Sequence, residues 1–234
     1  EVTNILQKFV KEKFGAETEV IPNGAQVVFD QESDRLAQWN LEKNGYLLVV
    51  SRLIGHKGIH YLIEAFKNLE DKNLTGGKKL VIVGDGSYTD DYVAELKKIS
   101  EGRKNIVFTG AQSGSDLRQL FSHSHFFIQP SDYEGLSITL LEAMGYGKAV
   151  LVSDIEENME VIGGAGASFH HGDVSDLEKK ILELLNDQEK IDGLGRAGKA
   201  RVEESYDWDR ISDRTEELYR NIVDKKSVKI FSSN

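Results

Sequence analysis

The chain has 234 residues, of which 29 are basic and 39 acidic, so its formal net charge at pH 7 is −10. This acidic balance, with no run of basic residues, argues against nucleic acid as the main partner. Because the chain contains no cysteine, disulfides and thiolate metal sites are excluded. No apolar run approaches the roughly 18 to 20 residues of a membrane span, and no signal peptide is visible. We therefore expect a cytoplasmic protein.

Predicted strands and helices alternate along most of the chain. Residues 3–14 carry apolar side chains at helical spacing. Five short apolar runs follow, over residues 46–50, 79–83, 105–108, 125–128 and 149–152. A helical pattern comes after each of them, over residues 58–70, 88–100, 115–122, 136–145 and 157–162. Because unbroken apolar strands between helices are typical of a parallel sheet covered on both faces, the sequence predicts an α/β fold with a Rossmann-like, doubly wound parallel sheet.

Three further helical patterns close the chain, over residues 174–187, 189–204 and 208–224. The last eight residues, SVKIFSSN, are loosely specified. No internal repeat or low-complexity linker divides the chain. We expect one domain over residues 1–226, with the first and last helices at its edges, and a flexible tail over residues 227–234.

The loop after the first predicted strand contains two cations and two glycines. Arg52 leaves the strand, and Lys57 lies five residues later, beside Gly55 and Gly58. In such a sheet, ligands bind where strands end and helices begin. Two cations at the mouth of a helix N-terminus suit a phosphate or diphosphate. The alternative is a solvated loop with two surface cations, and we expect His56 in this loop to be exposed and not catalytic.

Two other loops between strands and helices are rich in glycine. Gly84 begins the sequence GDGSY, which resembles a phosphate-binding turn, although such a turn is a weak signal and a structural role lining the site is the favoured interpretation. Gly110 and Ala111 lie in FTGAQSGSDL, where capping of the next helix is sufficient to explain the polar residues. Backbone groups near Gly110 and Ala111 could also face a ligand.

The most informative segment is SDYEGLSITLLEAMGYG, over residues 131–147. Gly135, Leu136 and Ser137 are expected to present free amide groups at a helix start, which is an anion site by geometry. Glu134 would repel a phosphate there, so its carboxylate is better explained by hydrogen bonds from hydroxyl groups. Glu142 lies two helical turns further along and can accept from a diol, as acids bind ribose. Together with the cations, these residues predict a sugar-nucleotide site.

At this point the motifs resemble a known family. They are VIPNG at residues 20–24, SRLIGHKGIHYLIEAF, VIVGDGSY, and the two glutamates separated by seven residues in YEGLSITLLEAMGYGKAVLVSD. In this order, and over about residues 1–220, they are similar to the retaining glycosyltransferases of family 4, the glycosyl transferases group 1, which have the GT-B fold. The resemblance is to the C-terminal, donor-binding half. It implies that the N-terminal, acceptor-binding domain is absent from this chain and that the last helix packs back toward it.

The resemblance also implies roles for the candidate residues. Arg52 and Lys57 would bind the donor diphosphate and stabilise the departing nucleoside diphosphate, so neither a metal ion nor another cofactor is expected. Glu134 would hold hydroxyl groups of the transferred sugar, and Glu142 those of the ribose. The amides of residues 135–137 would contact phosphate or sugar, and the base would lie near residues 110 and 111. By this resemblance the catalytic residues are Glu134, Arg52 and Lys57.

The partners implied are a nucleotide sugar and an acceptor glycan, lipid or small molecule, in cell-envelope polysaccharide synthesis. The resemblance allows peripheral membrane association of the whole enzyme. Front-face attack is the expected route to retention, and a covalent intermediate on Glu134 is disfavoured. Three alternatives are open: a non-catalytic module that binds a sugar nucleotide, a GT-B epimerase, and a nicotinamide-dependent dehydrogenase. The last is disfavoured because no G-x-G-x-x-G follows the first strand.

Overall fold

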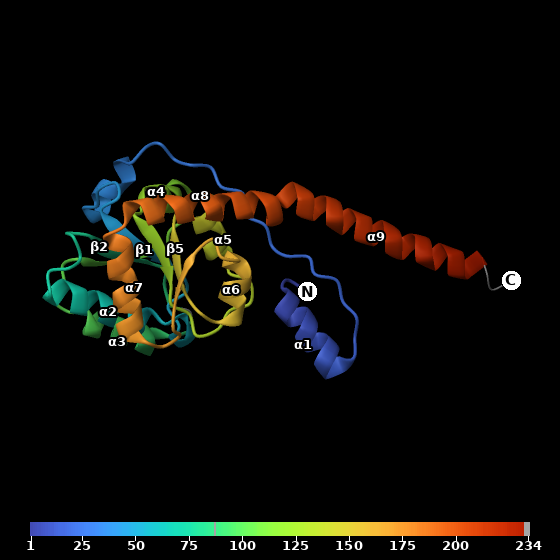
Figure 1. The fold of residues 1–234 in the computed structure, drawn as a ribbon, viewed down its shortest axis with the longest axis horizontal. Coiled ribbons are helices and arrows are strands. Elements are labelled where there is room, and N and C mark those ends of the chain that lie inside the picture. Colours follow the sequence, from blue (N-terminus) through green and yellow to red (C-terminus); the bar gives the residue numbers. More distant parts are fainter. Residues whose placement is uncertain (87, 232–234) are drawn as a thin grey trace.

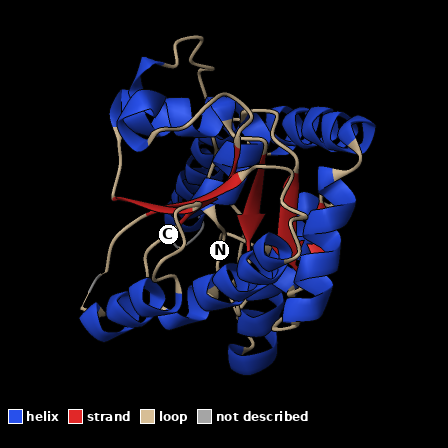
Figure 2. Cartoon of the chain, turned by 90° about the vertical axis from the view of Figure 1, so that its left-hand side faces the viewer, coloured by secondary structure: helices blue, strands red, loops and turns tan. Residues whose placement is uncertain are grey.

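A computed structural model describes residues 1–86 and 88–231, with only the backbone described for residues 225–231. At its centre lies a sheet of six parallel strands in the order β3-β2-β1-β4-β5-β6. The strands are β1 (Tyr46–Val50), β2 (Lys79–Val83), β3 (Ile106–Gly110), β4 (Phe126–Gln129), β5 (Val150–Ser153) and β6 (Ala167–Phe169). This is the strand order of a Rossmann-like fold, so the predicted doubly wound sheet is confirmed (Figure 2).

Helices cover both faces of the sheet (Figure 1). They are α1 (Asn4–Phe14), α2 (Ile59–Asp71), α3 (Asp90–Ile99), α4 (Gly114–His123), α5 (Ile138–Gly145), α6 (Glu156–Ile162), α7 (Val174–Leu185), α8 (Gln188–Ser205) and α9 (Trp208–Phe231). Two short 3₁₀ helices, η1 (Asp34–Trp39) and η2 (Gly55–Lys57), lie before β1 and α2. Each predicted helix is present.

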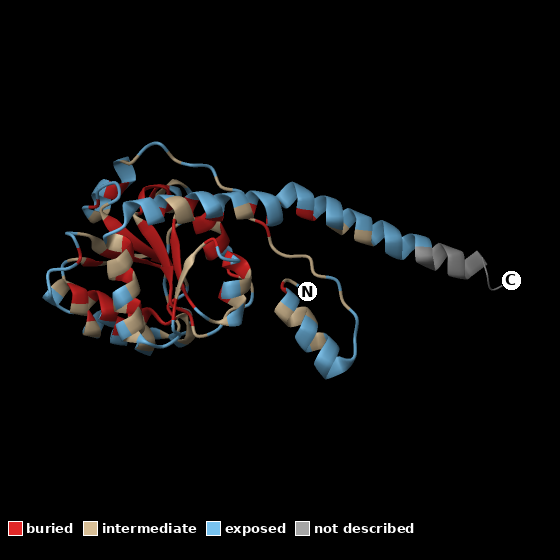
Figure 3. Ribbon diagram, viewed as in Figure 1, coloured by how far each residue is buried: buried red, intermediate tan, exposed pale blue. Residues whose placement is uncertain are grey.

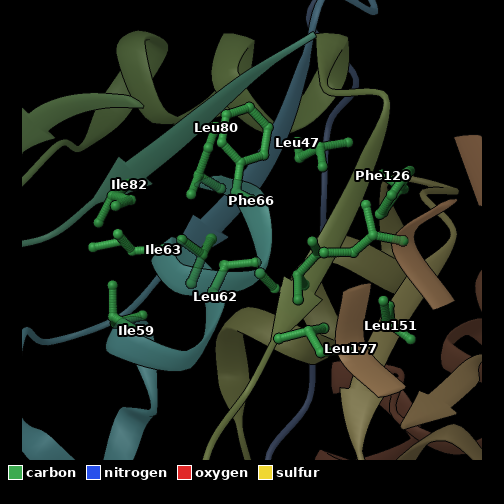
Figure 4. Packing of buried hydrophobic residues seen from close by; sticks show 14 of the residues in the cluster. Leu47, Ile59, Leu62, Ile63, Phe66, Leu80, Ile82, Phe126, Leu151 and Leu177 are labelled. Carbon is green, nitrogen blue, oxygen red and sulfur yellow. The ribbon is translucent and has the colours of Figure 1, made fainter. Parts of the chain in front are cut away.

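Alternate residues of each strand enter two different hydrophobic cores. In β1, Leu47 and Val49 face the core beneath α2, α3 and α7, while Leu48 and Val50 face the core beneath α4, α5 and α6. Figure 4 shows the first of these cores, with Phe66 of α2 among strand residues. Successive side chains of a strand point to opposite faces, so a strand buried on both faces must be apolar throughout. This requirement produced the unbroken apolar runs that predict the strands.

The structure differs from the prediction at several element boundaries. The three-residue strand β6 was not predicted, because its sequence ASF is too short to form an apolar run. Helix α5 begins at Ile138, two residues after the predicted start. Helix α9 continues to Phe231, beyond the predicted end at residue 224, and residues 232–234 of the predicted tail lie outside the described residues.

Helix α1 lies apart from the sheet and the helices that cover it, and helix α9 extends away from them (Figure 1). Helix α1 buries none of its residues (Figure 3). Its N-terminus is held by the Glu160 carboxylate of α6, which accepts hydrogen bonds from the amides of Asn4 at 2.8 Å and Ile5 at 3.3 Å. In the described part of the chain, every helix is too short or too polar to cross a membrane.

Candidate functional site

The candidate site lies where the strand order reverses, between β1 and β4. The loops that follow these two strands, residues 51–58 and 130–137, leave the same edge of the sheet side by side. Gly58 has a φ of +66°, and a Cβ atom there would lie 1.9 Å from the Pro130 carbonyl oxygen. The amide of Asp132 donates to the His56 carbonyl at 2.8 Å. Only glycine allows this approach, so Gly58 brings the two predicted loops into contact.

Lys57 and Glu134 form an ion pair across these loops. The Lys57 Nζ atom lies 2.7 Å from each carboxylate oxygen of Glu134. The two side chains are 14% and 7% exposed. Ser131 Oγ also donates to Glu134 Oε1 at 2.6 Å. The structure therefore brings together a predicted phosphate-binding cation and a predicted hydroxyl-binding acid, in a pairing that the sequence analysis did not predict.

Arg52 lies on the exposed rim of the same loop, and among the described residues it has no ion-pair partner. Burial lowers the pKa of His56, and the nearby positive charges of Lys57 and Arg52 lower it further. The negative charge of Glu134 acts in the opposite direction and raises the pKa, but the lowering effects are larger. His56 was expected to be exposed, but it is half-buried and stacks on Tyr133 with ring centroids 4.3 Å apart. Arg52 and Lys57 therefore both act electrostatically on His56, in the loop after β1.

The start of α5 supplies the predicted amide groups. Ser137 is its N-cap, and the Ser137 Oγ atom accepts from the Leu140 amide at 3.3 Å. In the described structure, the amides of Gly135, Leu136 and Ser137 have no hydrogen-bond acceptor in the protein. Free amides at a helix N-terminus attract an anion. The geometry on which the sequence prediction depended is therefore present.

Glu142 lies in the second turn of α5 and is half-buried. Burial raises the pKa of its carboxyl group. Within the described residues, no donor or cation contacts this carboxylate. The pKa of Tyr146, one turn further on, is raised to about 12 by burial and by the charge of Glu142. A half-buried acid without a partner is unfavourable in the free protein, so the structure leaves this carboxylate available to a ligand.

Gly84 has a structural role. Its φ is +144°, a Cβ atom there would lie 1.8 Å from the Ser51 carbonyl oxygen, and its amide donates to the Gly110 carbonyl at 3.0 Å. Gly110 and exposed Ala111 lie at the end of β3, which β2 separates from β1. Gly110 has open space where a side chain would be. These residues line the same sheet edge as Lys57 and Glu134 without touching that pair.

Sequence reasoning missed the polar residues that surround the ion pair. Asp132 accepts a hydrogen bond from His171 Nε2 at 2.9 Å, and it also lies against Tyr61. Gln129 and Ser153 are buried at the ends of otherwise apolar strands. A polar residue at the last position of an apolar strand was the available signal. No cluster of three or more histidine and acidic side chains suited to a metal ion occurs among the described residues.

Open surface pockets occur elsewhere in the described structure. One of about 310 Å³ lies at the C-terminal end of α5, lined by Tyr146, Phe29 and Val202 among others. Another of about 200 Å³ is lined by Ile21 and by Leu218 of α9, among others. Both lie away from the carboxyl ends of β1 and β4. The candidate site is assigned from its charges, free amides and position in the sheet, which are the features that a polar ligand requires.

Comparison with known proteins identifies the family and the fold of this chain. The family model described as glycosyl transferases group 1 matches residues 30–201. The sulfoquinovosyl transferase of Arabidopsis thaliana is 33% identical over 66% of this chain and 30% of its own length. The lipopolysaccharide 1,2-N-acetylglucosaminetransferase of Salmonella typhimurium is 28% identical over 95% of this chain and 62% of its own. The chain thus spans less than two thirds of either relative.

A solved structure shows the same fold. The Anabaena protein HepE, in complex with UDP, superimposes with a TM-score of 0.77 at 24% identity. The match covers 87% of this chain and 57% of HepE.

Removal of either partner of the ion pair should destabilise the protein. Lys57→Met leaves the nearly buried Glu134 carboxylate without its cation, and Glu134→Leu leaves the Lys57 ammonium group without its anion. We therefore expect each substitution to lower the free energy of unfolding by about 2–4 kcal/mol. The double variant should lose at least about 1 kcal/mol less than the sum. Urea unfolding measures all three. The exposed pair Lys199 and Glu203, 3.8 Å apart, is the control and should show a coupling below about 0.5 kcal/mol. Additive losses at residues 57 and 134 would contradict a direct pairing.

Replacement of Glu142 should stabilise the free protein in a pH-dependent way. A carboxyl group whose pKa is raised by folding destabilises the folded state once it is ionised, and this effect disappears below the unfolded value near 4.5. Glu142→Gln should therefore raise the free energy of unfolding at pH 7 by on the order of 1 kcal/mol, and the gain should vanish below about pH 4.5. The exposed Glu64 of α2 provides the control variant Glu64→Gln. Destabilisation by Glu142→Gln at pH 7 would show that Glu142 has a structural role.

Proposed function

The chain belongs to the family of glycosyl transferases group 1, and on this premise we propose that it binds a nucleotide-diphosphate sugar at the loops after β1 and β4. The observation that carries the proposal is the contact between Lys57 and Glu134. It joins a cation suited to phosphate with an acid suited to sugar hydroxyls. In a sugar nucleotide, the bond between sugar and phosphate lies between these two kinds of group, so the ion pair marks the position of the bond that breaks.

The diphosphate is held by Arg52, Lys57 and the free amides at the start of α5. A lysine ammonium has three N–H donors, so Lys57 can contact a phosphate oxygen while it remains on Glu134. Arg52 and Lys57 supply the charge that stabilises the departing nucleoside diphosphate, and in this proposal no metal ion is required. The structural neighbour HepE was solved with UDP, which supports a nucleotide as the ligand of this fold.

The remaining parts of the donor follow from this placement. Glu134 accepts hydrogen bonds from hydroxyl groups of the transferred sugar, and Glu142, further along α5, accepts them from the ribose. The base lies toward Gly110 and Ala111, at the end of β3. The free carboxylate of Glu142 and the open space at Gly110 support this direction.

We propose retention of configuration by front-face attack. The acceptor oxygen bonds to the anomeric carbon as the bond from that carbon to the phosphate oxygen breaks, and the acceptor proton passes to the departing phosphate. Both oxygens of Glu134 already accept hydrogen bonds from Lys57, and one also accepts from Ser131. Hydrogen bonds to a carboxylate weaken it as a nucleophile, which supports a binding role for Glu134.

The acceptor, in this proposal, is held by an N-terminal domain outside this chain. The chain spans less than two thirds of its relatives. Large apolar side chains are exposed on the two edge helices, including Phe14 at 67% and Tyr219 at 66%. The match to a lipopolysaccharide N-acetylglucosaminetransferase over 95% of the chain supports a role in cell-envelope polysaccharide synthesis. The alternative is a non-catalytic module that binds a sugar nucleotide.

Calorimetry with UDP, GDP and ADP tests donor binding by this chain. We expect one of them to bind, and Arg52→Ala to weaken its affinity at least tenfold because a charge-assisted hydrogen bond to phosphate is lost. Glu142→Gln should also weaken the affinity, because the hydrogen bonds that Glu142 accepts from the ribose hydroxyl groups become weaker. Glu64→Gln serves as the control and should leave the affinity unchanged. Failure of the unaltered chain to bind any of the three would contradict the proposal. Binding without transfer, even after an N-terminal domain is added, would favour the non-catalytic module.

Turnover by Glu134→Gln in the full-length enzyme tests the mechanism. We expect a loss of about 10²-fold or more, because the amide cannot pair with Lys57 or accept as strongly from the sugar. Mass spectrometry of the unaltered enzyme with a slow donor analogue should find no sugar attached to the protein. Detection of a sugar bonded to Glu134 would contradict front-face attack and would indicate a double displacement.

A further inference from the structure

A chain of buried polar side chains runs through the core beneath the candidate site. Its members come from β4, the loop after β4, β5, α6 and the start of α5, and none is more than 8% exposed: Gln129, Ser131, Ser137, Ser153 and Asn158. Their strand neighbours, such as Ile128 and Val152, are fully buried and apolar. The polar groups are therefore confined to the end of the sheet nearest Glu134.

One half of this chain ends on Glu134. Ser131 Oγ donates to the Glu134 carboxylate at 2.6 Å. Ser153 Oγ donates to the Ser131 carbonyl at 2.5 Å, and Asn158 Nδ2 donates to Ser153 Oγ at 3.0 Å and to the Ser153 carbonyl at 3.2 Å. Asn158 therefore supports, through two serines, the loop that carries Glu134.

The other half ends on the first turn of α5. Gln129 Nε2 donates to Asn158 Oδ1 at 2.7 Å, and Ser137 Oγ donates to Gln129 Oε1 at 2.6 Å. Ser137 Oγ in turn accepts from the Leu140 amide. Asn158 and Gln129 thus use both their donor and acceptor atoms, and together they connect the loop of Glu134 to the N-cap of α5.

Stability does not account for these residues. Each hydrogen bond compensates a desolvated polar group but adds little beyond that, and apolar residues of similar shape are often as stabilising in a core. A fully connected buried network instead selects one arrangement of the elements that it joins. Here it joins the acid proposed to bind the sugar and the amides proposed to bind phosphate.

We propose that Gln129 and Asn158 are positioning residues for the donor. They hold the Glu134 carboxylate and the amides of residues 135–137 at a constant separation, so that sugar and diphosphate are bound at once. This inference rests on the proposed function, because the donor contacts of Glu134 and α5 belong to that proposal. Neither Gln129 nor Asn158 touches the ligand.

The variant Gln129→Met tests this role, because methionine keeps the length of the side chain and removes both hydrogen bonds. Gln119 of α4 offers a matched control. It is fully buried, its Nε2 donates to Asp34 at 2.9 Å, and its Oε1 accepts from the Arg35 amide at 2.9 Å. Gln119→Met therefore removes the same number of hydrogen bonds from a buried glutamine on another part of the domain. Urea unfolding establishes how far each variant is destabilised.

Calorimetry with UDP-glucose, GDP-glucose and ADP-glucose gives the first readout, using whichever binds the unaltered chain. We expect Gln129→Met to lower the affinity at least tenfold and Gln119→Met to change it less than twofold. Equal effects of the two variants would overturn the positioning role. If Gln129→Met fails to fold, Ser131→Ala, which removes one hydroxyl group, should lower the affinity at least threefold; no change would overturn the proposal.

Amide hydrogen exchange of the ligand-free chain gives a readout that needs no donor. The amides of Leu140 and Leu141, which donate to Ser137 at the start of α5, should exchange at least tenfold faster in Gln129→Met and remain unchanged in Gln119→Met. Unchanged exchange in Gln129→Met would overturn the inference. If the unaltered chain binds no nucleotide sugar, the proposed function fails, and hydrogen exchange still decides whether the network holds the loop.

Discussion

The ion pair between Lys57 and Glu134 is the interaction on which the arrangement of the candidate site depends. It joins two loops that are 77 residues apart in the chain, and it can form only because β1 and β4 are neighbours in the sheet. The reversal of strand order at this point opens the edge of the sheet, since the helices on the two sides lie on opposite faces. Gly58 allows the backbones of the two loops to approach each other. The ion pair between Lys57 and Glu134 then links their side chains.

The site concentrates polar groups where the rest of the domain is apolar. Glu142 is half-buried with a raised pKa, Glu134 is nearly buried in its ion pair, and a network of buried hydrogen bonds connects Glu134 to the N-cap of α5. Such groups stabilise a folded protein little, because each must first be removed from water. The two hydrophobic cores on either side of the sheet provide the stability. The polar edge provides a fixed arrangement of donors and acceptors for the proposed donor.

Several features of the site could be read from the sequence because each depends on neighbours in the chain. Glu134 and the free amides after it belong to one segment, and so do Glu142 and the N-cap of α5. The strands were found because burial on both faces requires unbroken apolar runs. Strand β6 was missed because its three residues, ASF, form no such run. The roles of all the candidate residues in binding a donor, from Arg52 and Lys57 to Glu142, stay predictions.

By itself, the sequence determined the class of fold, the approximate position of strands β1 to β5 and of the helices, and the residue types at each of these strand ends. Only the tertiary structure decided that Lys57 pairs with Glu134, that Gly84 serves the packing of two loops, and that Gln129 and Asn158 connect Glu134 to α5. The reason is physical. Periodicity and helix capping act over a few residues, whereas these contacts depend on which strands are adjacent and on how closely two backbones approach. Neither is encoded in any single segment of the chain.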